Sequence, residues 1–485
     1  MQDTMLVLDF DREIARLIAR TLRSQQIYCE LVAHDTPARL LLERAPKGMI
    51  LAAGHESEIP FDSLDGELLQ SGVPVLALGN MVASLCVSFG GTVTDVLPQS
   101  NNVTLGLEDD RLFSEVSGGE RVLHDLHLIS LPDCLRSIAT ATERCIGFRH
   151  NELPLYAIQY PIERNDPDAI QLLRNFACNL CGMFPGWDEA AITEGATGSL
   201  REEAGDERVL CAVSGGVDSA VCAKLCHMAL GDRVACVFVD TGLLREDEAD
   251  TVIHGFMETM GLAVEYIDAK ERFLRALDGV NDDGEKSLIV SAQLVEVLAK
   301  RMEEEPDLHT LVLGTNLGDR LTCDTTISYP EKVNGQPLAI LEPAKDLFKE
   351  EVRRLALYLA LPGTVVERQP FPASGLALRI FGTVTEERLN VLRAADAFFV
   401  EEIRACGHEK RLWQYYATLT RNPSPPYGYA IALRSVQAGQ SGAYAARLPY
   451  DLLERVTERI LRELPGVTRV LYDLTPSVHY REIET

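Results

Sequence analysis

The hydrophobic pattern of the first part of the chain alternates short apolar runs with amphipathic segments. It begins with the apolar run 5–10, MLVLDF, and continues as a helical pattern over 11–25. Further strand-like runs lie at 28–33, 48–53 and 74–79. Short apolar runs separated by helical segments predict a parallel sheet covered on both faces. We therefore expect an α/β fold here.

The same pattern begins again after a polar, acidic stretch, with strand-like runs at 209–213, 233–240 and 311–315. Around Pro370 the pattern changes once more, to long amphipathic helices mixed with strand-like runs, which favours a small α+β domain. We predict a first α/β domain at 1–187, a linker at 188–207, a second α/β domain at 208–368 and an α+β domain at 369–485.

Composition and charge exclude several classes of partner. The chain has 485 residues, with 46 Lys and Arg against 73 Asp and Glu, a net charge of −27. That charge argues against a broad electrostatic grip on nucleic acid or on an anionic membrane. No apolar run approaches the roughly 18 residues that a membrane span requires, and the N-terminus lacks a signal-peptide pattern. The cysteines lie scattered in apolar runs, as in proteins of reducing compartments. We expect a cytoplasmic protein.

The sharpest chemical feature is a glycine-containing loop between a buried strand and a helix. Its residues are Ser214, Gly215, Gly216, Val217, Asp218 and Ser219. The glycines allow backbone N–H groups to approach an anion, and a helix N-terminus adds positive potential. The serines offer hydroxyl donors, and Asp218 is a candidate ligand for Mg²⁺ on a pyrophosphate. No Lys follows, so this is not a Walker P-loop. The alternative is an ordinary strand–helix turn with a serine cap.

This loop resembles that of the ATP pyrophosphatases, which split ATP between the α- and β-phosphates. The segments 238–250, 268–280, 341–357 and 447–473 resemble the GMP synthase family more closely. The resemblance implies a glutamine amidotransferase-like domain, an ATP pyrophosphatase domain and a C-terminal dimerisation domain, in that order. It also implies ATP and Mg²⁺ as cofactors, a homodimer, and a reaction in which adenylated XMP is aminated to GMP.

The amidotransferase site departs from the family pattern at two of its three catalytic positions. Where a segment resembling PVLGICYGMQLMA carries the nucleophilic Cys, this chain has Gly79. Where a segment resembling VQFHPE carries the His, it has Pro161, and only Glu163 remains. Thiolate catalysis needs a nucleophile and a base in contact. Neither Cys86, interpreted as a buried small hydrophobe, nor His55 replaces them. We expect no glutaminase activity and free ammonia as the nitrogen donor.

The ATP side keeps the family pattern. The resemblance assigns catalytic roles to Asp218, Ser219 and Lys349, with Asp218 as the Mg²⁺ ligand. It assigns nucleotide contacts to the loop 214–219, Val239, Asp240 and Gly314. A carboxylate at a strand end beside a phosphate loop, such as Asp240, suits contact with ribose or adenine. Lys349 is equally compatible with a solvated helix lysine paired to a glutamate.

The acceptor side is partly replaced. The chain has GTNLGDRLTCD at 314–324 where the family resembles GTLYPDVIES, and 327–333 lacks a Lys and both His of IKSHHNV. The loop 371–380 retains Gly375 and Arg379, whereas Ser477 stands at the position of the tail lysine. The candidate acceptor-binding residues are Arg245, Gly375, Arg379 and Arg481. Arg320 and Lys332 are alternative cationic donors, and Arg245 and Arg379 are equally compatible with salt bridges.

Three functional hypotheses follow from these residues. The first is an AMP-forming ligase that adenylates an acceptor oxygen, with XMP as the best single acceptor or a different small molecule in a paralogue. The second is a non-catalytic nucleotide-binding regulatory protein, which would explain both altered sites. The third is sulfur transfer to tRNA, for which Cys323 is the one candidate and against which the charge of −27 argues.

Overall fold

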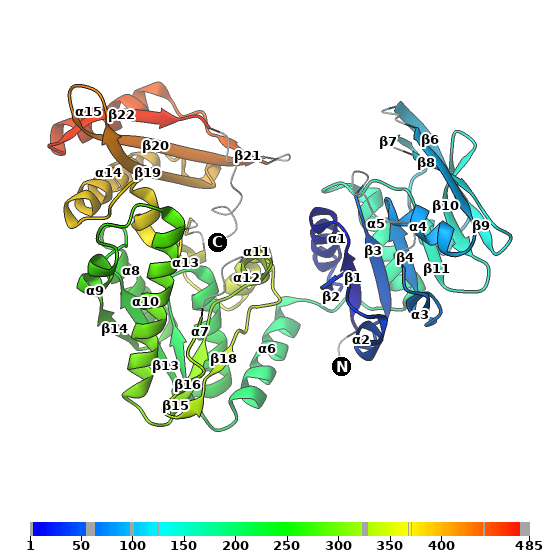
Figure 1. Cartoon of the computed structure of the whole chain (residues 1–485), viewed down its shortest axis with the longest axis horizontal. Helices are drawn as coiled ribbons and strands as arrows, with labels where there is room; N and C mark the ends of the chain where they lie inside the picture. The colour runs from blue at the N-terminus through cyan, green and yellow to red at the C-terminus, as the bar shows by residue number, and fades with distance from the viewer. Residues whose placement is uncertain are drawn as a thin grey trace. The chain divides into compact units, whose positions relative to one another are not determined.

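The structure is a computed structural model, and it describes residues 3–54, 64–97, 101–123, 126–322, 328–366, 368–369, 371–439 and 442–475. The chain divides into two compact units, Met1–Ala191 and Ile192–Thr485, and each is described here by itself (Figure 1). Among the described residues, no helix combines the length and the apolar character needed to cross a membrane.

The first half of unit 1 is the predicted parallel sheet. Its strands are β1 (Met5–Asp9), β2 (Cys29–Ala33), β3 (Gly48–Ala52) and β4 (Val75–Leu78), in the spatial order β2-β1-β3-β4. Its helices are α1 (Arg12–Ser24), α2 (Ala38–Glu43), α3 (Gly66–Leu69), α4 (Met81–Ser88) and α5 (Pro167–Asn175). Side chains of α2, α3 and α4 pack with the strands on one face, and α1 contacts α5. Asp11 caps α1 by accepting hydrogen bonds from the N–H groups of Glu13 and Ile14.

Beyond β4 the sheet continues with further strands, most of them antiparallel, that the sequence pattern did not predict. β11 (Leu155–Ile158) pairs parallel to β4, and an antiparallel extension follows in the order β10-β9-β6-β7. The further elements are β5 (Thr92–Leu97), β6 (Asn101–Leu107), η1 (Arg111–Phe113), β7 (Glu120–Leu123), β8 (Leu126–Ser130), β9 (Leu135–Ala141), β10 (Arg144–His150) and a π-helical turn at Phe176–Leu180. β9 and β10 mix buried and exposed positions, so they lack the continuous apolar runs of the parallel half.

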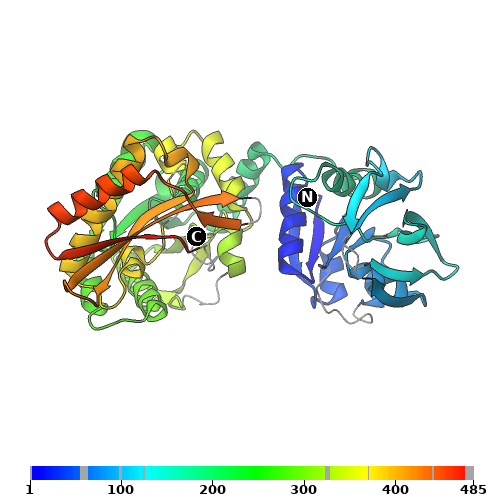
Figure 2. The ribbon, with the colours of Figure 1, turned by 90° about the horizontal axis from the view of Figure 1, so that it is seen from above.

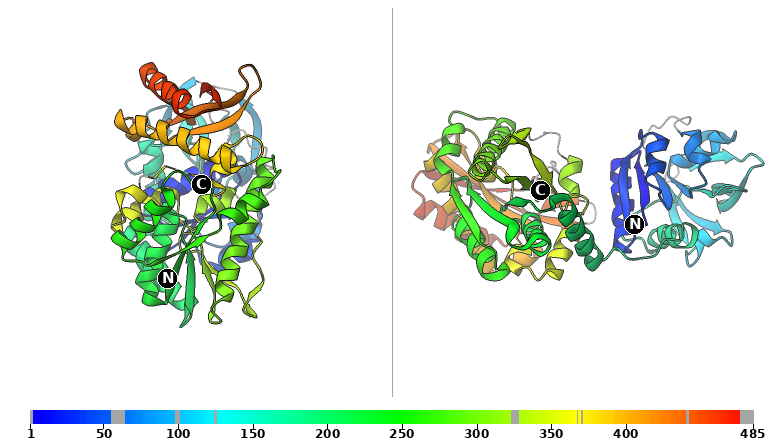
Figure 3. Two further views of the ribbon diagram at one scale, coloured as in Figure 1. Left: turned by 90° about the vertical axis from the view of Figure 1, so that its left-hand side faces the viewer. Right: turned by 90° about the horizontal axis from the view of Figure 1, so that it is seen from below.

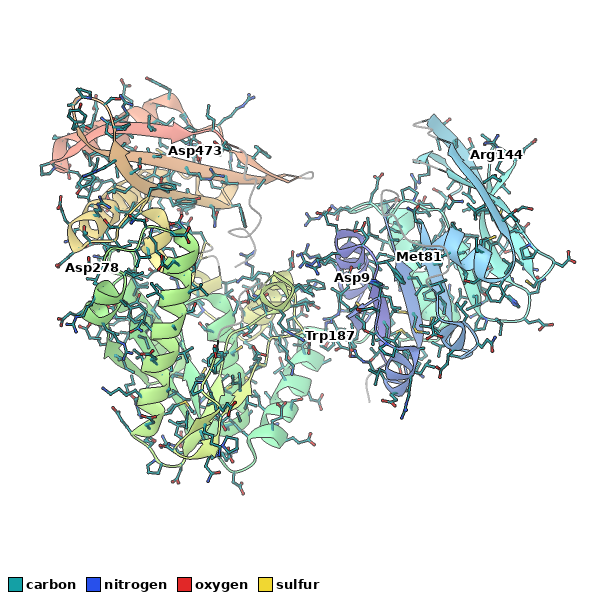
Figure 4. All side chains as sticks on the ribbon, viewed as in Figure 1. Asp9, Met81, Arg144, Trp187, Asp278 and Asp473 are labelled. Atoms are coloured by element: carbon teal, nitrogen blue, oxygen red, sulfur yellow. The ribbon has the colours of Figure 1, made fainter. Side chains whose placement is uncertain are left out.

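In unit 1, the guanidinium of Arg23 makes cation–π contacts with two aromatic rings. The guanidinium carbon of Arg23 lies 4.6 Å from the centroid of the Tyr28 ring and 4.8 Å from that of Trp187 (Figure 4). The N–H groups of Gly186 and Trp187 both donate to the carbonyl of Gln26. The chain end of this unit is therefore fixed against its own first helix. The segment predicted as a linker, 188–207, is mostly helix α6 (Glu189–Ala204).

The core of unit 2 is a fully parallel sheet in the order β14-β13-β12-β15-β18. Its strands are β12 (Arg208–Ala212), β13 (Val234–Asp240), β14 (Val264–Asp268), β15 (Leu308–Val312) and β18 (Ala339–Leu341), beside a hairpin of β16 (Lys332–Val333) and β17 (Gln336–Pro337). Its helices are α7 (Val217–Leu230), η3 (Gly231–Arg233), α8 (Glu248–Met260), α9 (Lys270–Ala276), α10 (Asp283–Glu303), α11 (Leu317–Thr322), α12 (Lys349–Tyr358), α13 (Gly363–Val366) and η4 (Gly375–Arg379). The strands predicted at 209–213 and 233–240 are thus confirmed to within one residue as β12 and β13, whereas the strand predicted at 311–315 lies three residues earlier, as β15.

The C-terminal part of unit 2 is an α+β layer on the parallel domain (Figure 2; Figure 3, left). It comprises α14 (Glu386–Ala405), η5 (Glu409–Arg411), β19 (Gln414–Asn422), β20 (Gly428–Gly439), β21 (Gly442–Ala445), α15 (Tyr450–Glu463) and β22 (Val467–Asp473). β19, β20 and β21 pair antiparallel, and β22 pairs parallel to β20. Apolar side chains of α14, α15 and the sheet share one hydrophobic core with residues of α9, α10 and η4.

A fully buried lysine joins the two layers of unit 2. The side chain of Lys286, on α10, is 0% exposed. Its ammonium donates to the carbonyls of Ala377 at 3.2 Å and Ile380 at 2.7 Å, and to the carboxylate of Asp283 at 2.9 Å. Buried charge is tolerated only where such partners exist. Lys286 therefore fixes the loop 371–380 to α10.

Replacing this lysine tests its structural role. We expect Lys286→Met to lower the free energy of unfolding by about 2–4 kcal/mol, because two buried carbonyls would lose their donor. Lys300→Met, an exposed lysine on the same helix, should change it by no more than about 0.5 kcal/mol. Urea denaturation of both variants measures the difference, and equal midpoints would contradict the assignment.

Candidate active site

The candidate site of unit 2 lies at the carboxyl edge of its parallel sheet. The chain runs from β12 outward to β13 and β14 on one side and then returns to β15 on the other side of β12. Parallel α/β sheets bind ligands at the strand ends where the order reverses in this way. The loop 214–216 follows β12, and Gly314 follows β15. The topology thus brings the predicted nucleotide-binding residues to one edge.

The phosphate loop has the local geometry that its sequence predicts. Gly215 has a φ of +78°, and a Cβ there would lie 2.2 Å from Val252 Cγ2 and 2.6 Å from an Arg368 nitrogen. The hydroxyl of Ser219 accepts from the N–H of Ser214 at 3.1 Å and donates to the carbonyl of Gly216 at 3.0 Å. These bonds hold the loop against the first turn of α7, whose N–H groups have no partner within the helix. Such a turn favours a phosphate.

Asp218 lies in that first turn, and two donors hold its carboxylate. The ammonium of Lys349 is 2.5 Å from Oδ2, with side chains 23% and 14% exposed. The amide nitrogen of Asn316 donates to Oδ1 at 3.3 Å. Lys349 thus pairs with Asp218 rather than with a glutamate of its own helix. Mg²⁺ prefers oxygen ligands and is commonly held by one or two carboxylates together with substrate phosphates, so Asp218 fits the ion.

Gly314 makes this arrangement possible. A Cβ at Gly314 would lie 2.8 Å from the backbone N and 2.9 Å from the Cα of Ser219. Only a glycine lets the turn after β15 lie this close to the first turn of α7. The predicted nucleotide-binding position therefore has a demonstrable packing role, and the nucleotide contact itself stays a prediction.

Asp240 ends β13 and is buried, at 4% exposure. Its carboxylate accepts from the N–H of Gly242 at 2.9 Å and from the hydroxyl of Tyr266 at 2.8 Å, and it lies 3.2 Å from the ammonium of Lys270. Burial, followed by the hydrogen bond to Asp240, raises the pKa of Tyr266. Asp240 therefore stabilises the turn that follows β13. Its neighbour Val239 lies within β13, and contacts of either residue with ribose or adenine stay predictions.

Two of the candidate acceptor residues share one buried carboxylate. Asp396, on α14, lies 3.2 Å from Nε of Arg245 and 3.7 Å from a terminal nitrogen of Arg379. Its Oδ1 also accepts from the N–H of Ala417 at 2.9 Å. The Arg379 guanidinium carbon lies 4.2 Å from the centroid of the Tyr416 ring. Both arginines therefore form the salt bridges that the sequence left open, and their acceptor role stays a prediction.

Gly375 is a close-packing position. Its φ is +60°, and a Cβ would lie 2.4 Å from the carbonyl oxygen of Leu243. The N–H of Leu376 donates to that same carbonyl at 2.7 Å. From α14, Arg393 donates to the carbonyls of Leu244 and Gly242, and burial lowers its pKa. The loop 371–380 is thus fixed to the carboxyl end of β13.

The other cationic candidates lie elsewhere or outside the described residues. Arg320 donates to Asp346 at 2.8 Å, and both side chains are about half exposed, at 48% and 49%. Lys332 is exposed on the hairpin of β16 and β17. Arg481, Ser477 and Cys323 lie outside the described residues.

In unit 1, parallel pairing of β4 and β11 brings the altered amidotransferase positions to one sheet edge. Leu78 is the register partner of Ile158, so Gly79 and Pro161 follow neighbouring strand ends. Gly79 has a φ of +61°, and a Cβ there would lie 2.0 Å from the carbonyl oxygen of Ala53. Helix α4 begins just beyond, at Met81 (Figure 4). The space that a nucleophilic side chain requires is therefore filled by backbone.

Of the possible substitutes, Cys86 lacks the environment of a reactive thiol. Cys86 is buried in α4, and burial raises the pKa of its thiol to about 11, so the thiolate is scarce at neutral pH. Glu163 is exposed. Beside Pro161, the buried Tyr160 donates to Asp166 at 3.2 Å and accepts from Arg121 at 2.9 Å. His55 lies outside the described residues.

Three site residues escaped the sequence analysis. Asn316 contacts Asp218, Arg368 donates to the carbonyl of Ser214 at 3.4 Å, and Asp396 pairs with both acceptor arginines. Asn316 lies in the segment 314–324, whose sequence shows only that it departs from the family motif. Arg368 and Asp396 are distant in sequence from their partners, and no local pattern marks them.

Comparisons with known proteins agree with this layout. Three family models match in succession: glutamine amidotransferase class-I over residues 6–180, NAD synthase over 191–391 and GMP synthase C terminal domain over 401–479. The chain is 35% identical to a GMP synthase (glutamine-hydrolyzing) of Carboxydothermus hydrogenoformans and 36% identical to that of Caldicellulosiruptor saccharolyticus, over 98% of this chain and 98% of each relative. The chain belongs to the GMP synthase family.

A relative of the same name from Dehalococcoides mccartyi is 34% identical over 98% of this chain and 94% of its own length. These matches confirm the predicted family, the α/β class and the order of the domain types. At this level the protein is a GMP synthase-like ATP-dependent ligase.

The two loop glycines provide a matched test of the phosphate loop. We expect Gly215→Ala to lower the free energy of unfolding by about 2–4 kcal/mol, because it combines a left-handed φ with overpacking. Gly216→Ala should change it by less than about 1 kcal/mol, because the nearest heavy atom to its Cβ is Ser214 Oγ at 3.4 Å. Chemical denaturation measures the unfolding free energy of both variants. A Gly215→Ala variant as stable as the unchanged protein would contradict the loop geometry.

Proposed function

We propose that the protein adenylates an acceptor oxygen with Mg·ATP, with XMP as the best single candidate for the acceptor, and aminates the adduct with free ammonia rather than with glutamine-derived ammonia. The observation that carries this proposal is a contrast between two sheet edges. At the sheet edge of unit 2, Asp218 is paired with Lys349. At the sheet edge of unit 1, the carbonyl oxygen of Ala53 lies where the side chain of a nucleophile at position 79 would be.

The ATP half follows from the residues at the carboxyl edge of β12. The N–H groups of the loop 214–219 bind phosphate oxygens, and the hydroxyl of Ser219 keeps the loop in shape. Asp218 would hold Mg²⁺, and the ion would supply positive charge against the pyrophosphate leaving group. The ammonium of Lys349, already 2.5 Å from Asp218, adds a second positive charge where negative charge develops.

The amination half requires a nitrogen nucleophile from solution. A ring oxygen becomes a good leaving group once it carries AMP. Ammonia then forms the new carbon–nitrogen bond, the carbon–oxygen bond breaks, and AMP leaves with that oxygen. Only NH₃, and not NH₄⁺, has the lone pair for this attack, so the reaction should accelerate with rising pH. The relatives reported above carry the name glutamine-hydrolyzing, whereas this chain has Gly79 where the family pattern has the nucleophilic Cys.

The acceptor side combines residues of the family pattern with arginines that already have a partner. The loop 371–380 keeps Gly375 and Arg379, which favours the family's purine nucleotide. Both Arg245 and Arg379 are paired to Asp396, so an acceptor phosphate would have to compete with that carboxylate. A different small-molecule acceptor is therefore the alternative within the proposal. The proposal also includes a cytoplasmic homodimer associated through the C-terminal domain.

Product analysis tests the proposed reaction. With ATP, Mg²⁺, XMP and high ammonium at about pH 8.5, we expect release of pyrophosphate, AMP and GMP. Glutamine in place of ammonium should give no GMP, and Asp218→Ala should abolish pyrophosphate release. Pyrophosphate without GMP would identify the acceptor as another molecule. No pyrophosphate despite ATP binding would favour a regulatory protein, and glutamine-dependent GMP formation would refute the loss of glutaminase.

A second test concerns the closed amidotransferase site. We expect the double variant Gly79→Cys/Pro161→His to release no glutamate from glutamine, because the carbonyl of Ala53 occupies the space of the new side chain. Gly79→Cys should also lose stability. Gly72→Cys is the matched control, because Gly72 has a φ of +77° with nothing within 4 Å of its Cβ. Glutaminase activity in the double variant would show that the carbonyl of Ala53 does not prevent a Cys at position 79 from acting as the nucleophile.

A further inference from the structure

The carboxylate of Asp218 is held from both sides by side chains of different kinds. Lys349 reaches Oδ2 with a charged ammonium at 2.5 Å, whereas Asn316 reaches Oδ1 with a neutral amide at 3.3 Å. The Asn316 residue is buried, at 1% exposure. A buried amide aimed at a carboxylate leaves that carboxylate its full negative charge and fixes the direction in which it points.

The position of Asn316 is itself fixed by the start of α11. Its backbone N–H donates to Oδ2 of Asp319 at 2.9 Å, and its side-chain oxygen accepts from the N–H of Asp319 at 3.2 Å. This reciprocal cap sets the side-chain rotamer and directs the amide nitrogen toward Asp218. The close approach of Gly314 to Ser219 supplies the remaining constraint.

We propose that Asn316 is a positioning residue for the metal-binding carboxylate. It fixes Oδ1 of Asp218, so that Oδ2 is presented to Lys349 and to Mg²⁺ carried by the nucleotide. The inference rests on the proposed role of Asp218. A side chain that donates a hydrogen bond to a metal ligand orients that ligand, and its loss typically lowers metal affinity by about 10–100-fold.

The proposal also links the phosphate loop to the region of the predicted acceptor site. Asn316 begins the segment 316–324, in which this chain departs from the family motif, and α11 continues directly from its cap. A shift of α11 would therefore move the amide that orients Asp218. Asn316, the third position of the segment 314–324, thus contacts Asp218 beside the phosphate loop, where the family motif has leucine.

Asn316→Ser is the principal test variant. Serine keeps an oxygen for the helix cap but is too short to reach Asp218. Calorimetric titration of the full-length protein with a non-hydrolysable ATP analogue, in Mg²⁺ and in EDTA, separates metal-dependent from metal-independent binding. We expect the gain in affinity that Mg²⁺ provides to fall by about tenfold, with the affinity in EDTA unchanged. Asn316→Leu, which restores the family's residue type, should behave alike.

Two controls make the outcome decisive. Asp319→Ala removes the carboxylate that accepts from the Asn316 backbone N–H but keeps the backbone N–H at position 319 that holds the Asn316 side chain, so the Mg²⁺-dependent gain should persist. Asp218→Asn should abolish that gain, and if it does not, the proposed metal role of Asp218 fails. If Asp218→Asn abolishes the gain while both Asn316 variants keep it, the positioning role is overturned. An equal loss in Mg²⁺ and in EDTA would also overturn it, because a general structural defect produces that result.

Discussion

The assembly of the candidate active site depends on the close contact between the turn after β15 and the first turn of α7. The missing Cβ of Gly314 allows backbone to lie against backbone there, with Ser219 N only 2.8 Å from where that Cβ would be. A larger residue would separate the two strand ends and move Asn316 away from Asp218. The loop 214–219, the carboxylate of Asp218 and helix α11 form one packed group because of this contact.

The two units share one architectural feature, but the residues that it brings together differ. Each has a parallel sheet whose carboxyl edge collects the residues of a site. In unit 2 the edge has an ion pair, Asp218 with Lys349, beside the first turn of α7, whose N–H groups have no partner within the helix. In unit 1 the corresponding edge has Gly79 against the carbonyl of Ala53. A fold can therefore be retained while the space for one side chain disappears, because the sheet is stabilised by its buried strands and not by its catalytic residues.

The acceptor side shows how a charged residue can be recruited for packing. Asp396 pairs with Arg245 and Arg379 from two different segments and also accepts from a backbone N–H of β19. Removing one member of such a buried network typically costs about 3–5 kcal/mol, because the remaining charge has no partner. Together with Lys286, this network fixes the loop 371–380 between the parallel domain and the C-terminal layer.

The sequence by itself determined the first four strands of unit 1, the strands β12 and β13, the glycine-containing loop and the family. These features are local: β12 and β13 are continuous apolar runs, and the loop 214–219 needs only its own glycines and serines. The antiparallel extension of unit 1 has mixed strands with no clear period, so it escaped prediction. Only the tertiary structure decided that Lys349 pairs with Asp218, that Asn316 is its second donor, and that Asp396 holds both arginines. Each of these pairs joins residues far apart in the chain, and local patterns carry no information about which distant side chain will meet a given charge.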